Sequence, residues 1–452
     1  MANQVKIRRG ADIKLQGEAE KVKSDAPLPS SFALKPTDFQ GLIPKMCVKQ
    51  GDTVKAGDPI FYDKTNEHVK FTSPVSGEVA EIVRGEKRRI LEVRIIPDST
   101  QDYAAFDVSN LDSAEGVKKI LMASGYWGFL RQRPYDIIAD PTQTPKAIFI
   151  SAFDSAPLAP DYDFLLHGQK NAFQAGLDAI SKLTKGKVHL TTRGRSSADE
   201  VFTEASGVEK NTITGPHPAG NVGIQIHHID PINKGDIVWT INAQAVAMIG
   251  RFIKTGKVDF SKIIALAGSE VEKPRYLHTW VGASMKSIVD GQVNEGDNRV
   301  ISGNVLSGIQ VEENGYLGFH DDLVTVIPEG RDPQFLGWIA PNLRKLSFSR
   351  AYMSWLMPSK EFRLNTNMNG EDRAFVVTGQ YERVFPMDIY PVFLLKAIMT
   401  KDVEKMEVLG IYEVAPEDMA LCEFGCTSKM EVQRILREGL DLPEVALVAI
   451  LD

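Results

Sequence analysis

The sequence predicts a multidomain protein of mixed α/β and α+β class. Three observations predict this class. Turn-punctuated strands fill the first hundred residues, strand–helix alternation begins near residue 147, and apolar stripes of helical period follow residue 332. A chain of 452 residues is also too long for one compact core. We therefore expect four domains, over residues 1–100, 101–257, 258–332 and 333–452.

The first domain is expected to be rich in β-strands. Residues 48–64 read V-K-Q-G-D-T-V-K-A-G-D-P-I-F-Y-D-K, in which two Gly-Asp turns separate short apolar pieces. Residues 69–82 then place a proline and a glycine between two alternating strands. This pattern resembles the barrel-sandwich fold of biotinyl and lipoyl carrier domains. Such carriers present a modifiable lysine at a hairpin tip, which here would be Lys64, but we favour an unmodified lysine on a longer hairpin.

The second domain alternates strands and helices. Strand–helix–strand at this spacing implies a parallel or mixed sheet, and hence a Rossmann-like α/β domain. The predicted strands are 146–151, 236–241 and 262–268, and the predicted helices are 171–183 and 246–253, the second capped by Asn242.

The last two domains differ in composition. Residues 274–328 predict a small mixed domain, with a strand at 276–281, a short helix at 284–289 and further strands around Val300 and Leu323. Beyond residue 332 the chain becomes rich in Met, Arg and Leu and predicts a helical domain. One helical stripe there contains Val392, Leu395, Ile398 and Met399.

Composition and charge exclude several functional classes. The 52 basic and 59 acidic residues give a net charge of −7, which argues against binding of nucleic acid. The short basic run at 87–89 is typical of a solvated hairpin tip. Three cysteines exclude a disulfide framework and fit a reducing cytoplasm. The N-terminus lacks the apolar stretch of a signal peptide, and no apolar run is long enough to span a bilayer, so a role at a membrane would require a partner.

Two loops could carry a site. In the loop G-P-H-P-A-G at 215–220, two alternatives stay open for His217. The loop presents its imidazole to a ligand or partner, or the loop is only a rigid connector before a strand at 223–230. On that strand, His227 and His228 would point to opposite faces, so we expect no metal there. In the segment S-G-Y-W-G-F-L-R-Q-R-P at 124–134, the aromatic side chains and arginines could bind a ring or a partner chain. Alternatively, the segment could only be part of the hydrophobic core and its rim.

Six segments together carry a resemblance along nearly the whole chain. They are I-K-L-Q-G, V-K-F-T-S-P-V-S-G, W-G-F-L-R-Q-R-P, G-P-H-P-A-G-N-V-G, I-S-G-N-V-L-S-G and A-L-C-E-F-G-C. The chain is similar to the NqrA family of Na⁺-translocating NADH:quinone oxidoreductases. The resemblance implies a peripheral subunit on the cytoplasmic side of a bacterial inner membrane. It would dock on the membrane subunit NqrB beside the other Nqr subunits.

The same resemblance carries expectations about cofactors. The family is similar in layout to the C subunit of the Rnf complex and to the NADH-binding flavoprotein subunit of complex I, which have a glycine-rich flavin loop, an SLBB (β-grasp) domain and cluster-bearing helices. Where those relatives hold flavin, this chain has residues 127–134. The resemblance therefore implies a cofactor-free, non-catalytic chain, with NADH, FAD, FMN and Fe–S in other subunits and quinone as a possible ligand. Residues suggested for quinone or partner contact are Trp127, Phe129, Arg131, Arg133 and His217.

The cysteine pair decides against an iron–sulfur site. A [4Fe–4S] cluster is held by four cysteine thiolates, whereas the chain has three cysteines, and one of these, Cys47, belongs to the first domain. Cys422 and Cys426 are expected to face a helical core, as the remnant of a lost site. The alternative function, a soluble flavin- or cluster-dependent NADH dehydrogenase, would need a phosphate-cradling loop and four thiolates, and the sequence offers neither.

Overall fold

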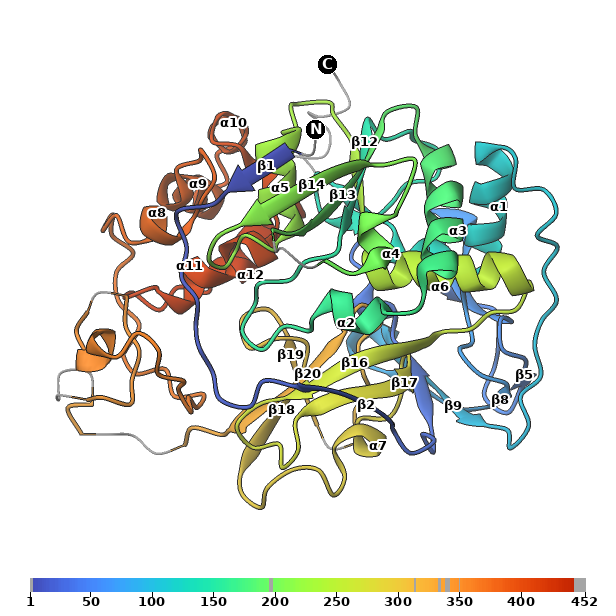
Figure 1. The fold of residues 1–452 in the computed structure, drawn as a ribbon, viewed down its shortest axis with the longest axis horizontal. Helices are drawn as coiled ribbons and strands as arrows, with labels where there is room; N and C mark the ends of the chain where they lie inside the picture. The colour runs from blue at the N-terminus through green and yellow to red at the C-terminus, as the bar shows by residue number, and fades with distance from the viewer. Residues whose placement is uncertain are drawn as a thin grey trace.

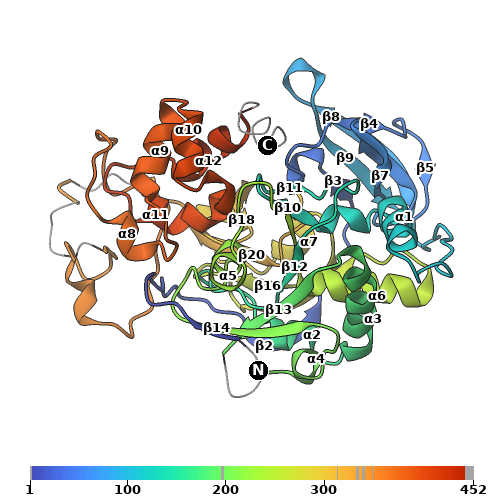
Figure 2. The ribbon, with the colours of Figure 1, turned by 90° about the horizontal axis from the view of Figure 1, so that it is seen from above.

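The structure is a computed structural model, and it describes residues 3–194, 198–312, 314–331, 335–337, 342–348 and 350–442. Its sheets form two small layers near the N-terminus, a seven-stranded sheet and a six-stranded sheet. The helical C-terminal region and the small N-terminal sheets lie on opposite sides of the molecule, with the seven-stranded sheet between them (Figure 1, Figure 2). The chain is therefore a mixed α/β multidomain protein, as expected.

The small N-terminal sheets pack face to face around aromatic side chains. Phe61 and Phe71 stack with ring centroids 5.0 Å apart, and Phe39 contacts Phe71 at 4.4 Å. Lys64 lies in the turn between β6 and β7, and its amide donates to the carbonyl of Ile43 at 2.8 Å. The strands are β3 (Phe32–Leu34), β9 (Ile90–Pro97), β8 (Gly77–Arg84) and β5 (Thr53–Val54) in one sheet, and β4 (Pro44–Met46), β6 (Pro59–Asp63) and β7 (Asn66–Thr72) in the other.

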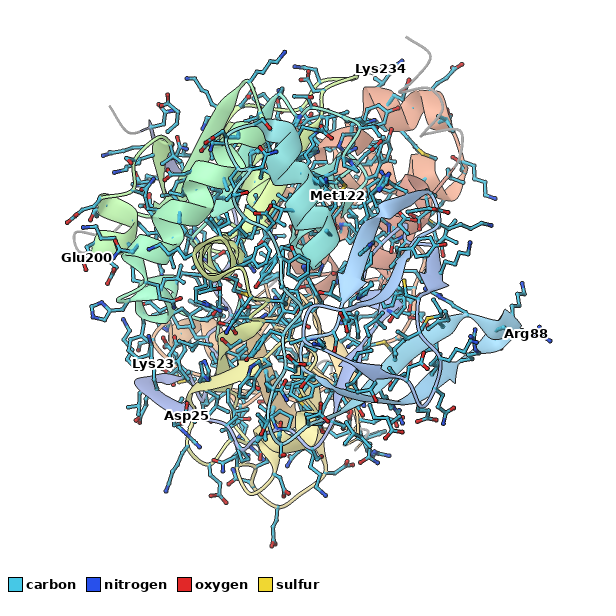
Figure 3. The ribbon with its side chains drawn as sticks, turned by 90° about the vertical axis from the view of Figure 1, so that its right-hand side faces the viewer. Lys23, Asp25, Arg88, Met122, Glu200 and Lys234 are labelled. Atoms are coloured by element: carbon cyan, nitrogen blue, oxygen red, sulfur yellow. The ribbon has the colours of Figure 1, made fainter. Side chains whose placement is uncertain are left out.

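The basic run at 87–89 lies at a hairpin tip, as its composition predicts. It follows β8 and precedes β9, and Figure 3 shows Arg88 at the far end of that hairpin. All three side chains are exposed.

The seven-stranded sheet has the order β1-β14-β13-β12-β15-β10-β11. The chain passes from β12 outward to β13 and β14, and then returns to the other side of β12 as β15, parallel to it. The strand order therefore reverses between β12 and β15. The strands are β1 (Asn3–Lys6), β14 (Glu209–Thr214), β13 (Lys187–Arg193), β12 (Ala147–Ser151), β15 (Val238–Asn242), β10 (Arg131–Arg133) and β11 (Ile137–Ile138).

Two long helices cover one face of this sheet. In α3 (Lys170–Ile180) the predicted apolar stripe is buried, and in α6 (Ala243–Thr255) Asn242 caps the first turn by accepting from the amide of Ala245. The two helices cross at glycines. A Cβ placed on Gly250 would lie 1.7 Å from the carbonyl oxygen of Ala172, so only glycine permits this approach. Further helices of the domain are α1 (Ala114–Ser124), α2 (Tyr162–Leu166) and α4 (Glu200–Thr203).

The predicted strand at 223–230 is wrong, because these residues form the helix α5 (Val222–Ile229). The alternation of Ile224 and Ile226 with polar neighbours is typical of a strand, yet both side chains are buried within this short helix. Asn221, in extended conformation, occupies the N-cap position.

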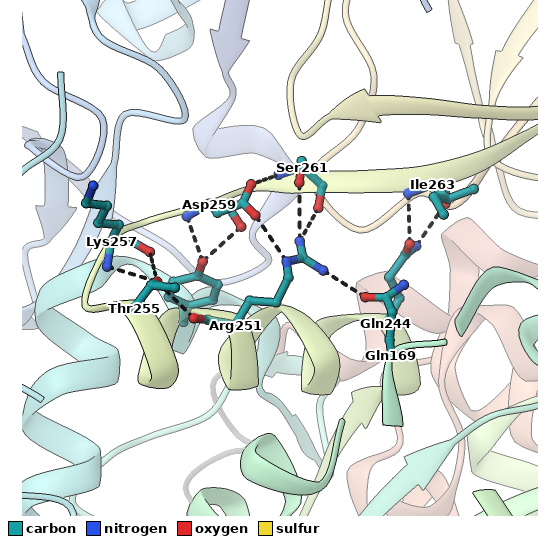
Figure 4. A network of polar contacts seen from close by, with 9 residues as sticks. Gln169, Gln244, Arg251, Thr255, Lys257, Asp259, Ser261 and Ile263 are labelled. Atoms are coloured by element: carbon teal, nitrogen blue, oxygen red, sulfur yellow. Dashed lines mark hydrogen bonds and ion pairs between the residues drawn. The ribbon is translucent and has the colours of Figure 1, made fainter. Parts of the chain in front are cut away.

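The six-stranded sheet has the order β19-β18-β20-β16-β17-β2, and it contains the strands and the short helix that we expected. Gln244 of α6 exchanges two hydrogen bonds with the backbone of Ile263, and Arg251 donates to the carbonyl of Ser261, so α6 holds the start of the interior strand β16 (Figure 4). The elements are β2 (Glu20–Asp25), β16 (Ser261–Ala267), β17 (Arg275–Trp280), α7 (Met285–Val289), β18 (Asn298–Ser302), β19 (Ile309–Val311) and β20 (Leu323–Pro328).

The C-terminal region is helical, but within the described residues beyond 331 its α-helices begin only at Tyr381. In α9, the predicted stripe is buried except for Met399, which is 53% exposed because it lies in the last turn of the helix. The helices are α8 (Tyr381–Val384), α9 (Pro391–Met399), α10 (Val403–Val408), α11 (Ala420–Phe424) and α12 (Val432–Leu440). No helix in the part of the chain that the structure describes is long and apolar enough to cross a membrane.

The first 25 residues belong to sheets formed much later in the chain. β1 pairs with β14, and β2 pairs with β17. Between them the chain runs along the molecule from one sheet to the other (Figure 1).

Candidate functional site

A cavity of about 190 Å³ opens where the strand order reverses. Its floor is formed by the carboxyl ends of β12 and β15, through residues 151–154 and 240–242. In open α/β sheets, ligands bind in the crevice at this point, because the connections diverge to opposite faces of the sheet. The other lining residues come from six further segments of the chain: Phe129 and Arg131; Tyr162; His217, Gly220, Asn221 and Val222; Asn304, Leu306 and Ser307; His320; and Glu417 and Ala420.

Three of the five residues suggested from the sequence line this cavity, namely Phe129, Arg131 and His217. Trp127 is fully buried behind it, where its indole N–H donates to the carbonyl of Ala139 at 2.7 Å and its ring meets Trp239 edge to face at 5.3 Å. The structure thus brings together the two loops that the sequence suggested separately.

His217 presents a buried imidazole to the cavity. The residue is 3% exposed, and Nδ1 lies 3.0 Å from the hydroxyl of Ser155. Nε2 has no hydrogen-bond partner among the described residues. Burial lowers the pKa of His217 to about 4, although the carboxylate of Asp12 opposes this shift. The side chain is therefore neutral near pH 7, with one unused nitrogen.

A second neutral imidazole, that of His320, also lines the cavity. Burial, together with the positive charges of Arg131 and Lys262, lowers the pKa of His320 to about 3. Its ring packs edge to face against Phe129 at 6.1 Å and Phe319 at 5.1 Å. The wall formed by these rings is apolar in character.

Arg131 supplies the cation of the lining, and its guanidinium pairs with Asp136. Burial alone would raise the pKa of Asp136, but the positive charges of Arg131, Arg133 and Arg437 outweigh it and hold the pKa below its ordinary value. Asp136 is therefore a carboxylate at neutral pH.

Arg133 lies two residues further along β10, and only 1% of its side chain is exposed. Its guanidinium donates to Asp418 at 3.0 Å and to Glu417 at 2.7 Å, both on the turn before α11. Burial raises the pKa of Glu417 to about 7 against the opposing charge of Arg133. This buried ion pair joins the seven-stranded sheet to the helical region beside the cavity.

A further polar cluster includes lining residues of the cavity and a buried ion pair next to them. Lys262 and Asp322 form a buried ion pair at 2.7 Å, and the same carboxylate accepts from Tyr162 at 3.0 Å and Asn242 at 3.2 Å. Burial raises the pKa of Tyr162 well above its ordinary value, so the phenol stays protonated. Burial also raises the pKa of Asp154, whose carboxylate accepts from the amide of Ala156 at 2.8 Å.

The residues considered for metals lie elsewhere. His227 bonds Glu413 at 2.8 Å and His228 bonds the carbonyl of Ile224 at 2.9 Å, so the two imidazoles have separate partners, although their rings meet edge to face at 5.2 Å. Cys422 and Cys426 are buried in the core of the helical region, as expected, and Tyr381 donates its O–H to the thiol of Cys426 at 2.9 Å. In the described parts of the chain, no group of three His, Cys, Asp or Glu side chains is placed to hold a metal ion.

Sequence reasoning missed several lining residues. Asn242 directly follows one predicted strand and Asp154 comes three residues after another, and the rule that ligands bind at the carboxyl ends of parallel strands could have identified them. His320 and Glu417 come from distant segments that carry no local signal of a shared site.

Three family models match the chain. They are described as the NqrA N-terminal barrel-sandwich hybrid domain, over residues 5–98, the NqrA second alpha/beta domain, over 112–258, and the NQRA C-terminal domain, over 263–313. The last of these models is an SLBB model.

Full-length relatives give the same result. The chain is 40% identical to the A subunit of the Na(+)-translocating NADH-quinone reductase of Neisseria meningitidis serogroup A, over 97% of this chain and 99% of that protein. It is also 40% identical to the protein of the same name from Serratia proteamaculans, over 96% and 98%. Among solved structures, an NAD⁺-reducing [NiFe]-hydrogenase in its air-oxidised state matches with a TM-score of 0.36 and 13% identity, over 75% of this chain and 67% of that chain.

Proposed function

The chain belongs to the NqrA family of Na⁺-translocating NADH-quinone reductases, and from this premise we propose that it is the peripheral NqrA component of such a membrane-bound complex. The observation that carries the proposal is the match at 40% identity over almost the full length of both proteins. The alternative, a soluble flavin- or cluster-dependent NADH dehydrogenase, is not favoured by these relatives.

The proposal extends to the partners and cofactors. The chain docks on the membrane subunit NqrB, on the cytoplasmic side of a bacterial inner membrane, while NADH, FAD, FMN and Fe–S belong to other subunits. The strand-order reversal at β12 and β15 supports the assignment of residues 101–257 as a Rossmann-like domain. The SLBB family match over 263–313 supports a β-grasp assignment for residues 258–332.

A quinone contact at the cavity is part of the proposal. A quinone ring needs an apolar surface and hydrogen-bonding groups near its carbonyl oxygens. Phe129 offers such a surface, and His217 and Arg131 offer the polar groups. Trp127 and Arg133 would act on the contact only indirectly, by holding the wall from behind.

Membrane vesicles test the function directly. We expect a bacterial strain that carries the other genes of the complex, but lacks this chain, to lose NADH-driven quinone reduction and Na⁺ uptake, and to regain both when the chain is supplied. Full activity in an assembled complex without the chain would refute the proposal. A stoichiometric flavin or iron–sulfur spectrum in the purified chain would refute its cofactor-free character.

Substitutions in the assembled complex test the quinone contact. We expect F129A and H217N to raise the KM for quinone several-fold, while E413Q, which removes an ion pair outside the cavity, leaves it unchanged. Unchanged KM and inhibitor sensitivity in F129A and H217N would exclude this cavity as the contact.

A further inference from the structure

The cleft at the strand-order reversal has the features of an anion-binding site. Gly220, Asn221 and Val222 at the start of α5 line the cavity, and the first amides of a helix lack partners within it and carry its positive dipole end. Two arginines, Arg131 and Arg133, lie on the neighbouring strand β10. Phosphate groups of nucleotides bind to this combination of helix N-terminus and guanidinium groups.

An unused polar atom points to the same place. Nε2 of His217 is buried, lines the cavity and has no partner in the described part of the chain. A buried nitrogen without a partner costs free energy, so a ligand with a hydrogen-bonding atom would offset that cost. The cleft therefore has a polar atom available for a ligand, and the charge of the residues around the cleft decides which class of ligand binds there.

The place of the anion is already taken by carboxylates of the chain itself. Asp418 lies against the first turn of α5, where a Cβ on Gly223 would lie 2.2 Å from its Oδ2. The same oxygen accepts from Arg133 at 3.0 Å and from the amide of Ala415 at 2.9 Å. Glu417 accepts from the other terminal nitrogen of Arg133 at 2.7 Å and lines the cavity.

The remaining arginine is also neutralised internally. Arg131 pairs with Asp136, so the charge of each guanidinium on β10 is already balanced by a carboxylate of the chain. A phosphate group carries up to two negative charges, and above about pH 7, where Glu417 is ionised, it would meet Glu417 and Asp418 as like charges. At about 190 Å³ the cavity is also smaller than the roughly 300 Å³ at which pockets begin to enclose drug-sized ligands.

We propose that Glu417 and Asp418 act as built-in counter-anions that occupy the phosphate position of this cleft. The cleft consequently accepts uncharged ligands of about one ring and excludes phosphorylated nucleotides and flavins. This specificity is independent of which complex the chain joins, since it follows from residues within one chain.

Titration of the purified full chain tests the proposal. FMN is added with its fluorescence followed, and inorganic phosphate is added in a thermal-shift assay against chloride at equal ionic strength. We expect no saturable binding of either probe to the wild-type chain. We expect E417Q/D418N to be stabilised by phosphate concentrations that leave wild type unchanged, whereas FMN remains too large for the cavity.

The matched control is E413Q. Glu413 bonds His227 in the last turn of α5, away from the first turn where Asp418 lies and away from the cavity lining, so E413Q should bind neither probe. Circular dichroism and gel filtration report whether each variant is folded. If the double variant does not fold, D418N carries the same comparison, because asparagine keeps the shape of the side chain.

Two results would overturn the proposal. One is saturable binding of FMN or phosphate by the wild-type chain that R131Q weakens. The other is a folded E417Q/D418N or D418N variant that phosphate stabilises no more than it stabilises wild type.

Discussion

Replacing Arg133 with methionine should strongly destabilise the junction between the seven-stranded sheet and the helical region. The arginine is 1% exposed and holds Glu417 and Asp418 at 2.7 and 3.0 Å. Asp136, by contrast, would keep Arg131 as its partner. R133M therefore leaves the buried carboxylate of Asp418 and the partly exposed carboxylate of Glu417 without a counter-charge, while methionine preserves most of the apolar volume of the side chain.

The magnitude follows from the burial of the pair. Removing one partner of a buried ion pair costs about 3–5 kcal/mol, because the remaining charge stays desolvated. We expect a loss in this range at pH 8, where Glu417, with its pKa raised to about 7, is ionised. The loss should shrink toward pH 5, because the uncompensated carboxylates then take up protons.

Urea unfolding followed by tryptophan fluorescence measures this loss, since Trp127 and Trp239 are fully buried in the same domain as Arg133. R434M is the matched control. Arg434 also forms two ion pairs, but its side chain is 58% exposed, so its loss should cost less than about 1 kcal/mol. The cost of R133M should be smaller in a D418N background, where one buried charge is already removed. A cost of R133M equal to that of R434M would refute the reasoning.

Three further predictions follow from single features. The pKa of Glu417 in the folded chain, about 7, lies above its ordinary value of 4.5, so between these two values the folded chain retains a proton that the unfolded chain has lost. The free energy of unfolding should therefore fall as pH rises from about 4.5 to about 7. Urea titrations at each pH should show that E417Q lacks this pH-dependent part of the stability. G250A should lower the free energy of unfolding by about 1–3 kcal/mol, because its methyl group would lie 1.7 Å from the carbonyl oxygen of Ala172, whereas K254A on the exposed face of α6 should change it by less than about 0.5 kcal/mol. A thiol reagent should modify the exposed Cys47 in the folded chain and all three cysteines after denaturation. The reason is that Cys422 and Cys426 are buried and that burial raises the pKa of Cys422. Rapid modification of three thiols in the folded chain would contradict the burial of these two.

Local patterns in the sequence were sufficient where the burial of one face decides the element. The stripe of α3 and the cap at Asn242 were predicted correctly, because helical period and capping chemistry depend on residues a few positions apart. The same reasoning failed at α5, where eight residues are too few to separate helical from strand period. Asn221, at the N-cap position, was the better indication of a helix there, because a cap residue marks where a helix begins and does not depend on periodicity.

The site could be predicted only in part for a different reason. Phe129, Arg131 and His217 lie in loops of unusual composition, so the sequence suggested them, and the structure shows that they line one cavity. Glu417 reaches the same cavity from nearly 300 residues further along the chain than Phe129, and nothing local to Glu417 indicates a partner. Its role depends on tertiary packing, which residue spacing does not encode.

The pairing of β1 with β14 has a consequence for synthesis of the chain. Asn3 faces Asn211 in the register, so the first strand cannot find its place until some 208 further residues have left the ribosome. At about 5–20 residues per second, that wait lasts roughly 10–40 s. Throughout this time β1 stays unpaired and is a template for pairing with other chains. The same long sequence separation raises contact order, so closure of the N-terminal segment should be among the slow steps of folding.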